Sequence, residues 1–235
     1  QDADDVADHC AAGRGQHPDP ARQRGQGALA PGFEQALGRE LGLEALELAL
    51  QFAFAGGHIP GSINIPAGKN FSTWAGWLLP YDRPLVLLAR PEEVEALTRA
   101  LVRIGLDEVV GYIPGLEGYA QGELETVPQV TAKEAKELWE KGKAFVLDVR
   151  GRDEYLAGHI PGAQNIHAGR VLAHLDRLPK DRPLIVHCVG GDRSSTAISA
   201  LLAHGFRNAL NLTGGIKAWR EAGFPVVQGE ELVQA

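Results

Sequence analysis

Short apolar runs alternate with segments of helical periodicity along the last hundred residues of the chain. The runs are rich in branched apolar side chains and are bounded by polar turns, which is typical of buried strands. Each run leads into a segment of helical character, and the pairs are 144–149 with 153–157, 184–186 with 193–204, and 209–212 with 214–222. Strands that alternate with helices predict an α/β fold with a mainly parallel sheet flanked by helices. In such folds the functional groups gather at the carboxyl ends of the strands.

The chain repeats part of its own sequence at a spacing near one hundred residues. The string Gly-His-Ile-Pro-Gly occurs at 57–61 and again at 158–162, and Asn-Ile follows shortly after both copies. The string Asp-Arg-Pro-Leu occurs at 82–85 and again at 181–184. A recurring period indicates repeated folding units. We therefore expect two homologous halves, each with its own sheet flanked by helices.

The start of the chain differs from the rest. Residues 11–32 are rich in Gly, Ala, Pro, Gln and Arg without periodicity, which is typical of a flexible segment. Residues 41–55 carry conflicting signals, because their composition favours a helix whereas the repeat places a strand at 45–49. The predicted divisions are a flexible or degenerate segment at 1–45, a first half at 46–127 and a second half at 128–235.

Composition and charge narrow the functional classes. Of the 235 residues, 44% are hydrophobic and 23% are charged, as in ordinary globular proteins, and no apolar run approaches the ~20 residues that span a membrane. The net charge of -7 indicates no basic surface of the kind that binds nucleic acid. Cys10 and Cys188 lie in unlike contexts, so we expect no disulfide and a reducing, cytoplasmic location. Neither a membrane nor nucleic acid is expected as a partner.

The segment His187–Ser195, reading His-Cys-Val-Gly-Gly-Asp-Arg-Ser-Ser, carries the candidate chemistry. It joins a predicted buried strand to a predicted helix. Backbone N–H groups of a tight glycine-bearing loop converge on one point, and the start of the next helix adds partial positive charge. Arg193 adds charge nearby, so we expect Cys188 to be an ionised, accessible nucleophile. The alternative is a small buried hydrophobic residue at a strand end, a common place for a free cysteine.

The second half resembles a rhodanese domain over essentially its whole length. The matching segments are 148–150, 154–155, 158–163, 165–166, 188–194, 214–215, 218–219, 222–223 and 225–226. The resemblance implies a persulfide on Cys188, with Arg193 as its catalytic neighbour. It also implies that the other loop residues bind the transferred sulfur and the anionic part of the donor, chiefly through main-chain N–H groups; these are Val189, Gly190, Gly191, Asp192 and Ser194. Three further residues are expected to brace the sheet ends and loops rather than take part in the chemistry, namely Asp148, Arg150 and His159.

The length of the loop separates the candidate reactions. Phosphatases and arsenate reductases of related fold carry His-Cys-x5-Arg, a wider ring that holds a tetrahedral oxyanion. Here the arginine comes one position earlier, and the smaller ring suits a single sulfur atom. We therefore expect a sulfurtransferase that moves sulfane sulfur from thiosulfate or a low-molecular-weight persulfide to a thiol, sulfite or cyanide acceptor, without a cofactor. A non-catalytic sulfur carrier or docking module, and a phosphatase or arsenate reductase, stay open as alternatives.

The first half lacks the nucleophile. The repeat places Ala89 at the position of Cys188, and the Arg-Pro-Glu-Glu loop that follows has no glycine and is shorter by one residue. We therefore interpret residues 46–127 as an inactive rhodanese-like domain. Trp74 and Trp77 are expected in its core, the usual place for large aromatic side chains.

The tryptophan-bearing segment at 71–85 is similar to the degenerate rhodanese domain of certain bacterial fusion proteins. In these, a metallo-β-lactamase-fold persulfide dioxygenase precedes two rhodanese domains. The resemblance implies such a partner domain ahead of this chain, and a start at Gln1 with no methionine anywhere favours a fragment. The chain has no His-x-His-x-Asp-His motif, so we expect neither a metal site nor dioxygenase activity in it.

Overall fold

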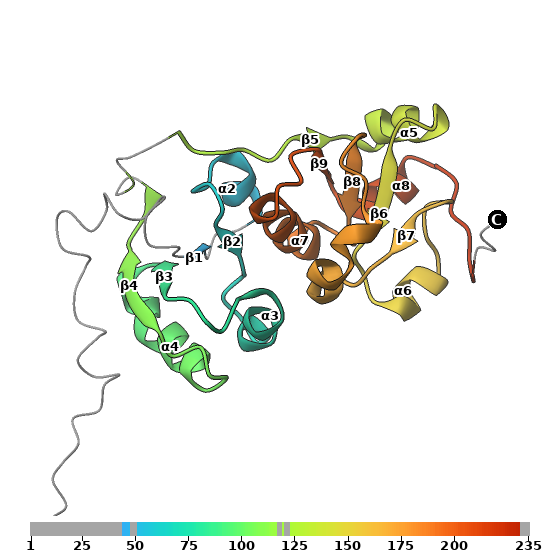
Figure 1. Cartoon of the computed structure of the whole chain (residues 1–235). Helices are drawn as coiled ribbons and strands as arrows, with labels where there is room; N and C mark the ends of the chain where they lie inside the picture. The colour runs from blue at the N-terminus through green and yellow to red at the C-terminus, as the bar shows by residue number, and fades with distance from the viewer. Residues whose placement is uncertain (1–43, 48–50, 117–118, 120–122, 231–235) are drawn as a thin grey trace, which may run out of the picture.

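The computed structural model describes residues 44–47, 51–116, 119 and 123–230. Within these residues the chain forms two sheets whose neighbouring strands are all parallel, with helices packed around them (Figure 1). This arrangement confirms the predicted α/β fold. The segment predicted to be flexible or degenerate lies outside the described residues, apart from its last two positions.

The first sheet has four strands in the order β2-β1-β3-β4. The strands are β1 (Glu44–Glu47), β2 (Ile63–Asn64), β3 (Leu85–Leu88) and β4 (Val109–Ile113). The helices are α2 (Gln51–Gly56), α3 (Phe71–Leu78) and α4 (Pro91–Val102). The strand that the repeat predicts near residue 45 is present as β1, which pairs with β2 on one side and β3 on the other. Strand pairing on both sides overrides the helical propensity of its composition.

The second sheet has five strands in the order β5-β9-β8-β6-β7. The strands are β5 (Gln129–Val130), β6 (Phe145–Asp148), β7 (Gln164–Asn165), β8 (Leu184–His187) and β9 (Ala209–Leu212). The helices are α5 (Ala132–Glu140), α6 (Arg152–Leu156), α7 (Asp192–Ala203), α8 (Gly215–Glu221) and the 3₁₀ segment η2 (Ala168–Arg177), which is kinked at His174. All three strand–helix pairs predicted for this half are confirmed, with every boundary within one residue.

The sequence repeat coincides with a repeated arrangement of strands and side chains. The order β2-β1-β3-β4 of the first sheet matches the order β7-β6-β8-β9 of the second, to which β5 is added. In the first half the ring of Phe54 stacks on His58 at a centroid distance of 3.9 Å, and in the second Tyr155 stacks on His159 at 3.6 Å. The Nδ1 atom of each histidine also lies within hydrogen-bonding distance of the carbonyl oxygen of its stacking partner, at 3.0 Å for His58 and 2.9 Å for His159.

Helix α7 lies between the two halves (Figure 1). Residues 194–202 are all buried, so the helix is covered on every side. The second sheet and η2 cover part of its surface, and α2 and β2 of the first half cover the rest. The largest cluster of buried hydrophobic side chains accordingly contains residues from both halves, such as Phe54 and Ile63 with Ile198 and Leu201. The two halves therefore share a core.

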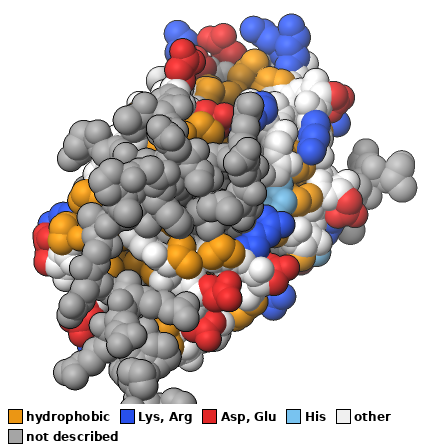
Figure 2. Space-filling view, turned by 60° about the vertical axis from the view of Figure 1, so that its left-hand side comes forward, with side chains coloured by type: hydrophobic (Ala, Val, Ile, Leu, Met, Phe, Trp, Pro, Cys, Tyr) orange, Lys and Arg blue, Asp and Glu red, His pale blue; other side chains and the backbone are white. Residues whose placement is uncertain are grey.

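The surface of the described residues carries charges of both signs. On the face in Figure 2, acidic and basic side chains are interspersed rather than gathered into one basic patch. None of the helices in the described part of the chain is long and apolar enough to cross a membrane.

Candidate active site

Cys188 directly follows β8 and begins the loop that leads into α7. Its side chain is 2% exposed and belongs to the shared hydrophobic core, whereas Val189 is 41% exposed and Gly190 is exposed as well. The expectation of an accessible sulfur is therefore wrong for this conformation. The sulfur points into the core because its Cα stands at the end of a fully buried strand, and the exposed part of the loop begins only at the next residue.

One backbone amide and one hydroxyl group approach the sulfur. The N–H of Gly191 donates a hydrogen bond to Cys188 Sγ with an N···S distance of 3.0 Å. Gly191 has φ +135°, a conformation that favours glycine, and it is the N-cap of α7. Ser194 Oγ lies 3.8 Å from Cys188 Sγ, 2.9 Å from the carbonyl oxygen of Gly191 and 2.8 Å from Asn211 Oδ1. The sulfur accepts from the N–H of Gly191 at the helix start, a contact that favours an anionic sulfur, whereas the Ser194 hydroxyl donates to Gly191 and Asn211.

The start of α8 holds the outer side of the same loop. The N–H groups of Ile216 and Lys217 donate to the carbonyl oxygens of Cys188 and Val189, at 3.0 Å and 3.4 Å. A Cβ atom at Gly215, which has φ +58°, would lie 2.5 Å from both oxygens, so only glycine allows this approach. Because the C=O and N–H of a trans peptide point in opposite directions, the N–H groups next to these carbonyls point away from α8.

Arg193 is paired with Glu154 of α6. The guanidinium donates two hydrogen bonds to the carboxylate, Nη1 to Oε2 at 2.5 Å and Nη2 to Oε1 at 2.9 Å. These hydrogen bonds lower the pKa of Glu154 to about 2, and Glu154 in turn raises the pKa of Arg193. The positive charge that the sequence predicts beside Cys188 is therefore shared with a carboxylate, and the bidentate geometry fixes its orientation.

Comparison with known proteins places this loop in a family. Residues 131–222 match the family model of the rhodanese-like domain. The chain is 35% identical over 92 residues to thiosulfate sulfurtransferase GlpE of Pseudomonas fluorescens (strain SBW25), an alignment that covers 39% of this chain and 84% of that protein. The chain belongs to the rhodanese-like family. The match covers one rhodanese-like domain, which lies within the second half.

Two further relatives are similar to the chain. A sulfurtransferase of Allochromatium vinosum is 35% identical over 86 residues, which covers 37% of this chain and 80% of that protein. The crystal structure of a thiosulfate sulfurtransferase from Pseudomonas aeruginosa is 25% identical, with a TM-score of 0.40, and the alignment covers 84% of this chain and 42% of that chain.

Asp148 and Arg150 form a buried ion pair at the carboxyl end of β6 in the rhodanese-like domain. Their side chains are 0% and 3% exposed, and Arg150 Nη2 lies 2.5 Å from Asp148 Oδ2. The same nitrogen donates to the carbonyl oxygen of Gly158 at 2.9 Å. His187 Nε2, at the end of β8, lies 3.8 Å from Asp148 Oδ2, and burial lowers the pKa of His187. These contacts connect the ends of β6 and β8 with the loop that precedes β7.

His159 is buried in that same loop. Its ring stacks on Tyr155, and its Nδ1 lies 2.9 Å from the carbonyl oxygen of that residue. Its backbone N–H and C=O both pair with Val227, at 2.9 Å and 3.0 Å. His159 thus ties the loop before β7 to the last described segment of the chain.

The position that matches Cys188 in the first half is Ala89, which is buried at the end of β3. Two residues separate β3 from α4, whereas four residues separate β8 from α7. The loop is therefore shorter by two residues, not by the one that the sequence predicts. Arg90 caps α4, and its guanidinium pairs with Glu93 on the surface, where Nη2 lies 2.7 Å from Oε1.

Trp74 and Trp77 of α3 face the rhodanese-like domain. The core prediction is wrong for Trp77, which is 45% exposed, whereas Trp74 is partly buried against the shared core. Their rings lie 5.8 Å and 5.3 Å from the ring of His167, just before η2. A Cβ atom at Gly169 would lie 2.0 Å from the ring of Trp77, so this ring rests on glycine backbone and leaves its other side open.

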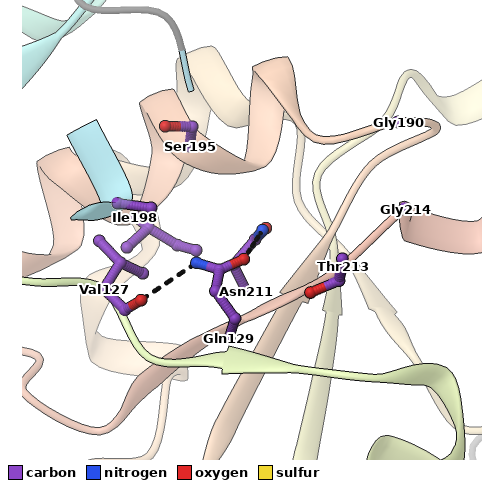
Figure 3. Close-up of a pocket in the computed structure, with 9 residues that line it drawn as sticks. Val127, Gln129, Gly190, Ser195, Ile198, Asn211, Thr213 and Gly214 are labelled. Carbon is purple, nitrogen blue, oxygen red and sulfur yellow. Dashed lines mark hydrogen bonds between the residues drawn. The ribbon is translucent and has the colours of Figure 1, made fainter. Parts of the chain in front are cut away.

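A small pocket adjoins the loop (Figure 3). Its volume of about 20 Å³ offers room for about one water molecule. Both halves contribute to its wall, among them Ala55, Val127, Gly190, Ser195 and Asn211. Asn211 Nδ2 donates to Gln129 Oε1 at 2.7 Å, and its Oδ1 contacts the serine beside the sulfur. The pocket is too small for a sulfur donor, so we assign it no substrate.

Sequence reasoning missed three residues that contact the loop. Glu154 and Gly215 belong to the segments that resemble rhodanese, yet neither was assigned to the site, because their partners follow only from the fold. Asn211 belongs to no recognisable sequence motif, because it lies within strand β9. Among the described residues, no group of three or more His, Cys, Asp or Glu side chains is placed to hold a metal ion.

Proposed function

We propose that the chain is a sulfurtransferase that carries sulfane sulfur on Cys188 as a persulfide. The donor is thiosulfate or a low-molecular-weight persulfide, and the acceptor is a thiol, sulfite or cyanide. The observation that carries this proposal is the 3.0 Å hydrogen bond from the N–H of Gly191 to Cys188 Sγ at the start of α7. Two relatives at 35% identity that bear the name sulfurtransferase support it.

The reaction has two displacement steps. In the first, the Cys188 thiolate attacks the outer sulfur of the donor, and the bond between that sulfur and the rest of the donor breaks. The leaving group takes the electron pair and departs as sulfite from thiosulfate, or as a thiolate from a persulfide. In the second, the acceptor attacks the outer sulfur of the Cys188 persulfide, and Cys188 leaves as the thiolate. The cycle needs no external oxidant or reductant.

The loop residues stabilise charge on sulfur during both steps. The N–H of Gly191 donates to Cys188 Sγ and is placed to stabilise negative charge on it, and Ser194 Oγ lies 3.8 Å from the same atom. Val189 and Gly190 form the exposed part of the loop, which moves aside to admit the donor. No atom lies within 4 Å of a Cβ built at Gly190, so this part of the backbone has free space around it.

Charged residues at the loop influence the choice of donor. Arg193, held by Glu154, supplies a positive charge in the first turn of α7. Asp192 is exposed in the first turn of α7 and adds a negative charge, which disfavours the binding of a dianion such as thiosulfate. Asp148, Arg150 and His159 serve as structural support for the neighbouring loops.

We also propose that the first half is an inactive rhodanese-like domain, which makes the chain a tandem pair. The shared strand order supports this, and Ala89 in place of the cysteine removes the nucleophile. The metallo-β-lactamase-fold partner domain stays a prediction.

The test is the intact mass of the protein after exposure to thiosulfate and, separately, to glutathione persulfide. We expect the protein to gain the mass of one sulfur atom and to lose it when cyanide, sulfite or a thiol is added. Cys188→Ser should gain none and keep an unchanged circular dichroism spectrum. Cys10→Ser is the matched control, because it removes the other thiol of the chain and should load fully.

Two results would replace the proposal with one of its alternatives. A protein that takes up sulfur but releases it to none of these small acceptors is a sulfur carrier or docking module. A protein that turns over phosphate esters or arsenate faster than it transfers sulfur is a phosphatase or an arsenate reductase.

A further inference from the structure

Asn64, at the end of β2 in the first half, forms hydrogen bonds with the helix that begins at the catalytic loop. Its side-chain Nδ2 donates to Ser195 Oγ at 2.8 Å, and its backbone N–H donates to Ser199 Oγ at 2.9 Å. Ser195 and Ser199 are four residues apart in α7, so they share the face that meets the first half. All three residues are buried, where a polar group that loses its partner costs stability.

Asn165 occupies the matching position in the second half. It ends β7 as Asn64 ends β2, and each is paired with the last residue of the neighbouring strand, Asp148 of β6 and Glu47 of β1. Asn165 Nδ2 donates to the carbonyl oxygens of Asp148 and Arg150, each at 2.9 Å. The two asparagines therefore have different partners: Asn165 holds the end of β6, and Asn64 holds the helix that follows β8.

Three successive hydrogen bonds connect the first half with the sulfur. Asn64 Nδ2 donates to Ser195 Oγ at 2.8 Å, and the N–H of Ser195 donates to the carbonyl oxygen of Gly191 at 2.9 Å. The N–H of Gly191 then donates to Cys188 Sγ at 3.0 Å. Ser195 also lines the small pocket beside the loop.

We infer that Asn64 is a positioning residue for the reaction at Cys188. By holding Ser195, it sets the first turn of α7 and with it the peptide of Gly191 whose N–H meets the sulfur. The half without a nucleophile thus acts on the half that has one. The rate measurement that tests this inference rests on the proposed sulfur transfer, whereas the measurement of amide exchange at Gly191 does not.

The experiment compares Asn64→Ala, Ser195→Ala and their double variant in the full chain. We expect each single variant to lower the maximal rate of sulfur loading from thiosulfate by about tenfold, the size expected for one lost buried hydrogen bond. The thiosulfate concentration for half-maximal rate should stay within about twofold, because no donor contact is removed. The double variant should load sulfur no more slowly than either single variant, because each of the three variants lacks the hydrogen bond between Asn64 and Ser195.

A second readout is amide hydrogen exchange at Gly191, measured by NMR relative to the amides of β6. Exchange should accelerate by about tenfold in Asn64→Ala and in Ser195→Ala, because the N–H is held less firmly. Ser199→Ala is the matched control, since it removes a bond across the same interface one turn farther from the loop. It should lower the free energy of unfolding yet leave both the loading rate and the Gly191 exchange rate unchanged.

The inference is overturned if Asn64→Ala changes neither readout, or if Ser199→Ala changes both as strongly as Asn64→Ala does. If Asn64→Ala fails to fold, the loading rate and the Gly191 exchange rate of Ser195→Ala test the inference instead. If the unmodified chain takes up no sulfur from thiosulfate or glutathione persulfide, the proposed function fails. In that case the exchange rate at Gly191 alone decides whether Asn64 positions the loop.

Discussion

Replacing Gly215 with alanine tests whether the contact between α8 and the loop sets the geometry of the reaction. The added Cβ would lie 2.5 Å from the carbonyl oxygens of Cys188 and Val189 and 2.8 Å from the carbonyl carbon of Val189. Ordinary contact begins at 3.4 Å, so the two groups must separate by about 0.9 Å. All three neighbours are backbone atoms, which cannot turn aside as the end of a side chain does.

The cost of this change has two parts. Alanine at the φ of +58° found for Gly215 costs about 1–2 kcal/mol, and forcing a packed loop apart adds about 1–3 kcal/mol. We therefore expect the free energy of unfolding to fall by about 2–5 kcal/mol. The rate of sulfur loading should fall by about 100-fold, because a displacement near 1 Å in a catalytic group has an effect of that size.

The assay combines urea denaturation with quenched sulfur loading followed by mass spectrometry. Gly223→Ala is the matched control, because Gly223 has φ +71° just after α8 but no atom within 4 Å of its Cβ position. It should lose only the stability that backbone strain costs and should load sulfur at the normal rate. If Gly215→Ala loads sulfur as fast as Gly223→Ala, the loop does not depend on α8 for its position and the reasoning is refuted.

Three other changes have expected outcomes. Arg150→Ala leaves a buried carboxylate without its cation and should lower the free energy of unfolding by about 3–5 kcal/mol in urea titrations. Ala89→Cys, introduced together with Cys188→Ser, should not restore sulfur uptake by mass spectrometry, because the shorter loop provides no glycine turn around the new thiol. Arg193 lowers the pKa of Glu154 from 4.5 to about 2, so their pair stabilises the folded state above about pH 4.5 and this contribution disappears as the pH falls toward 2. Glu154→Gln should therefore reduce thermal stability at pH 7, by less than about 1 kcal/mol for a part-exposed pair, and this effect should shrink as the pH falls through about 2.

Elements with a strong local pattern were predictable from the sequence. Strand β9 has the predicted bounds, and α7 is displaced by one residue, because apolar spacing and a terminal glycine are properties of the segment itself. Helix α5 was missed although its start carries a capping box of Thr131 and Glu134. Strand β5 has two residues and owes its existence to pairing with β9, a contact that no local pattern reveals.

The candidate site was predictable only where the motif is contiguous. The loop from Cys188 to Ser194 stands in one stretch of sequence, so its residue types and glycines indicated the chemistry. Glu154 joins this loop from 39 positions away, and Asn64 joins α7 from 131 positions away. Such pairs follow from how sheets and helices pack. The sequence left open whether Cys188 is accessible or buried at a strand end, and only the packing shows that it is buried.

The core that the two halves share has a consequence for how the molecule loses its structure. Because α7 is enclosed by both halves, separating them would bring apolar surface into water on each side. Heating should therefore melt the chain in one cooperative transition, with equal calorimetric and van't Hoff enthalpies, rather than in two steps. A chain that lost the first half would have to cover that face of α7 in another way.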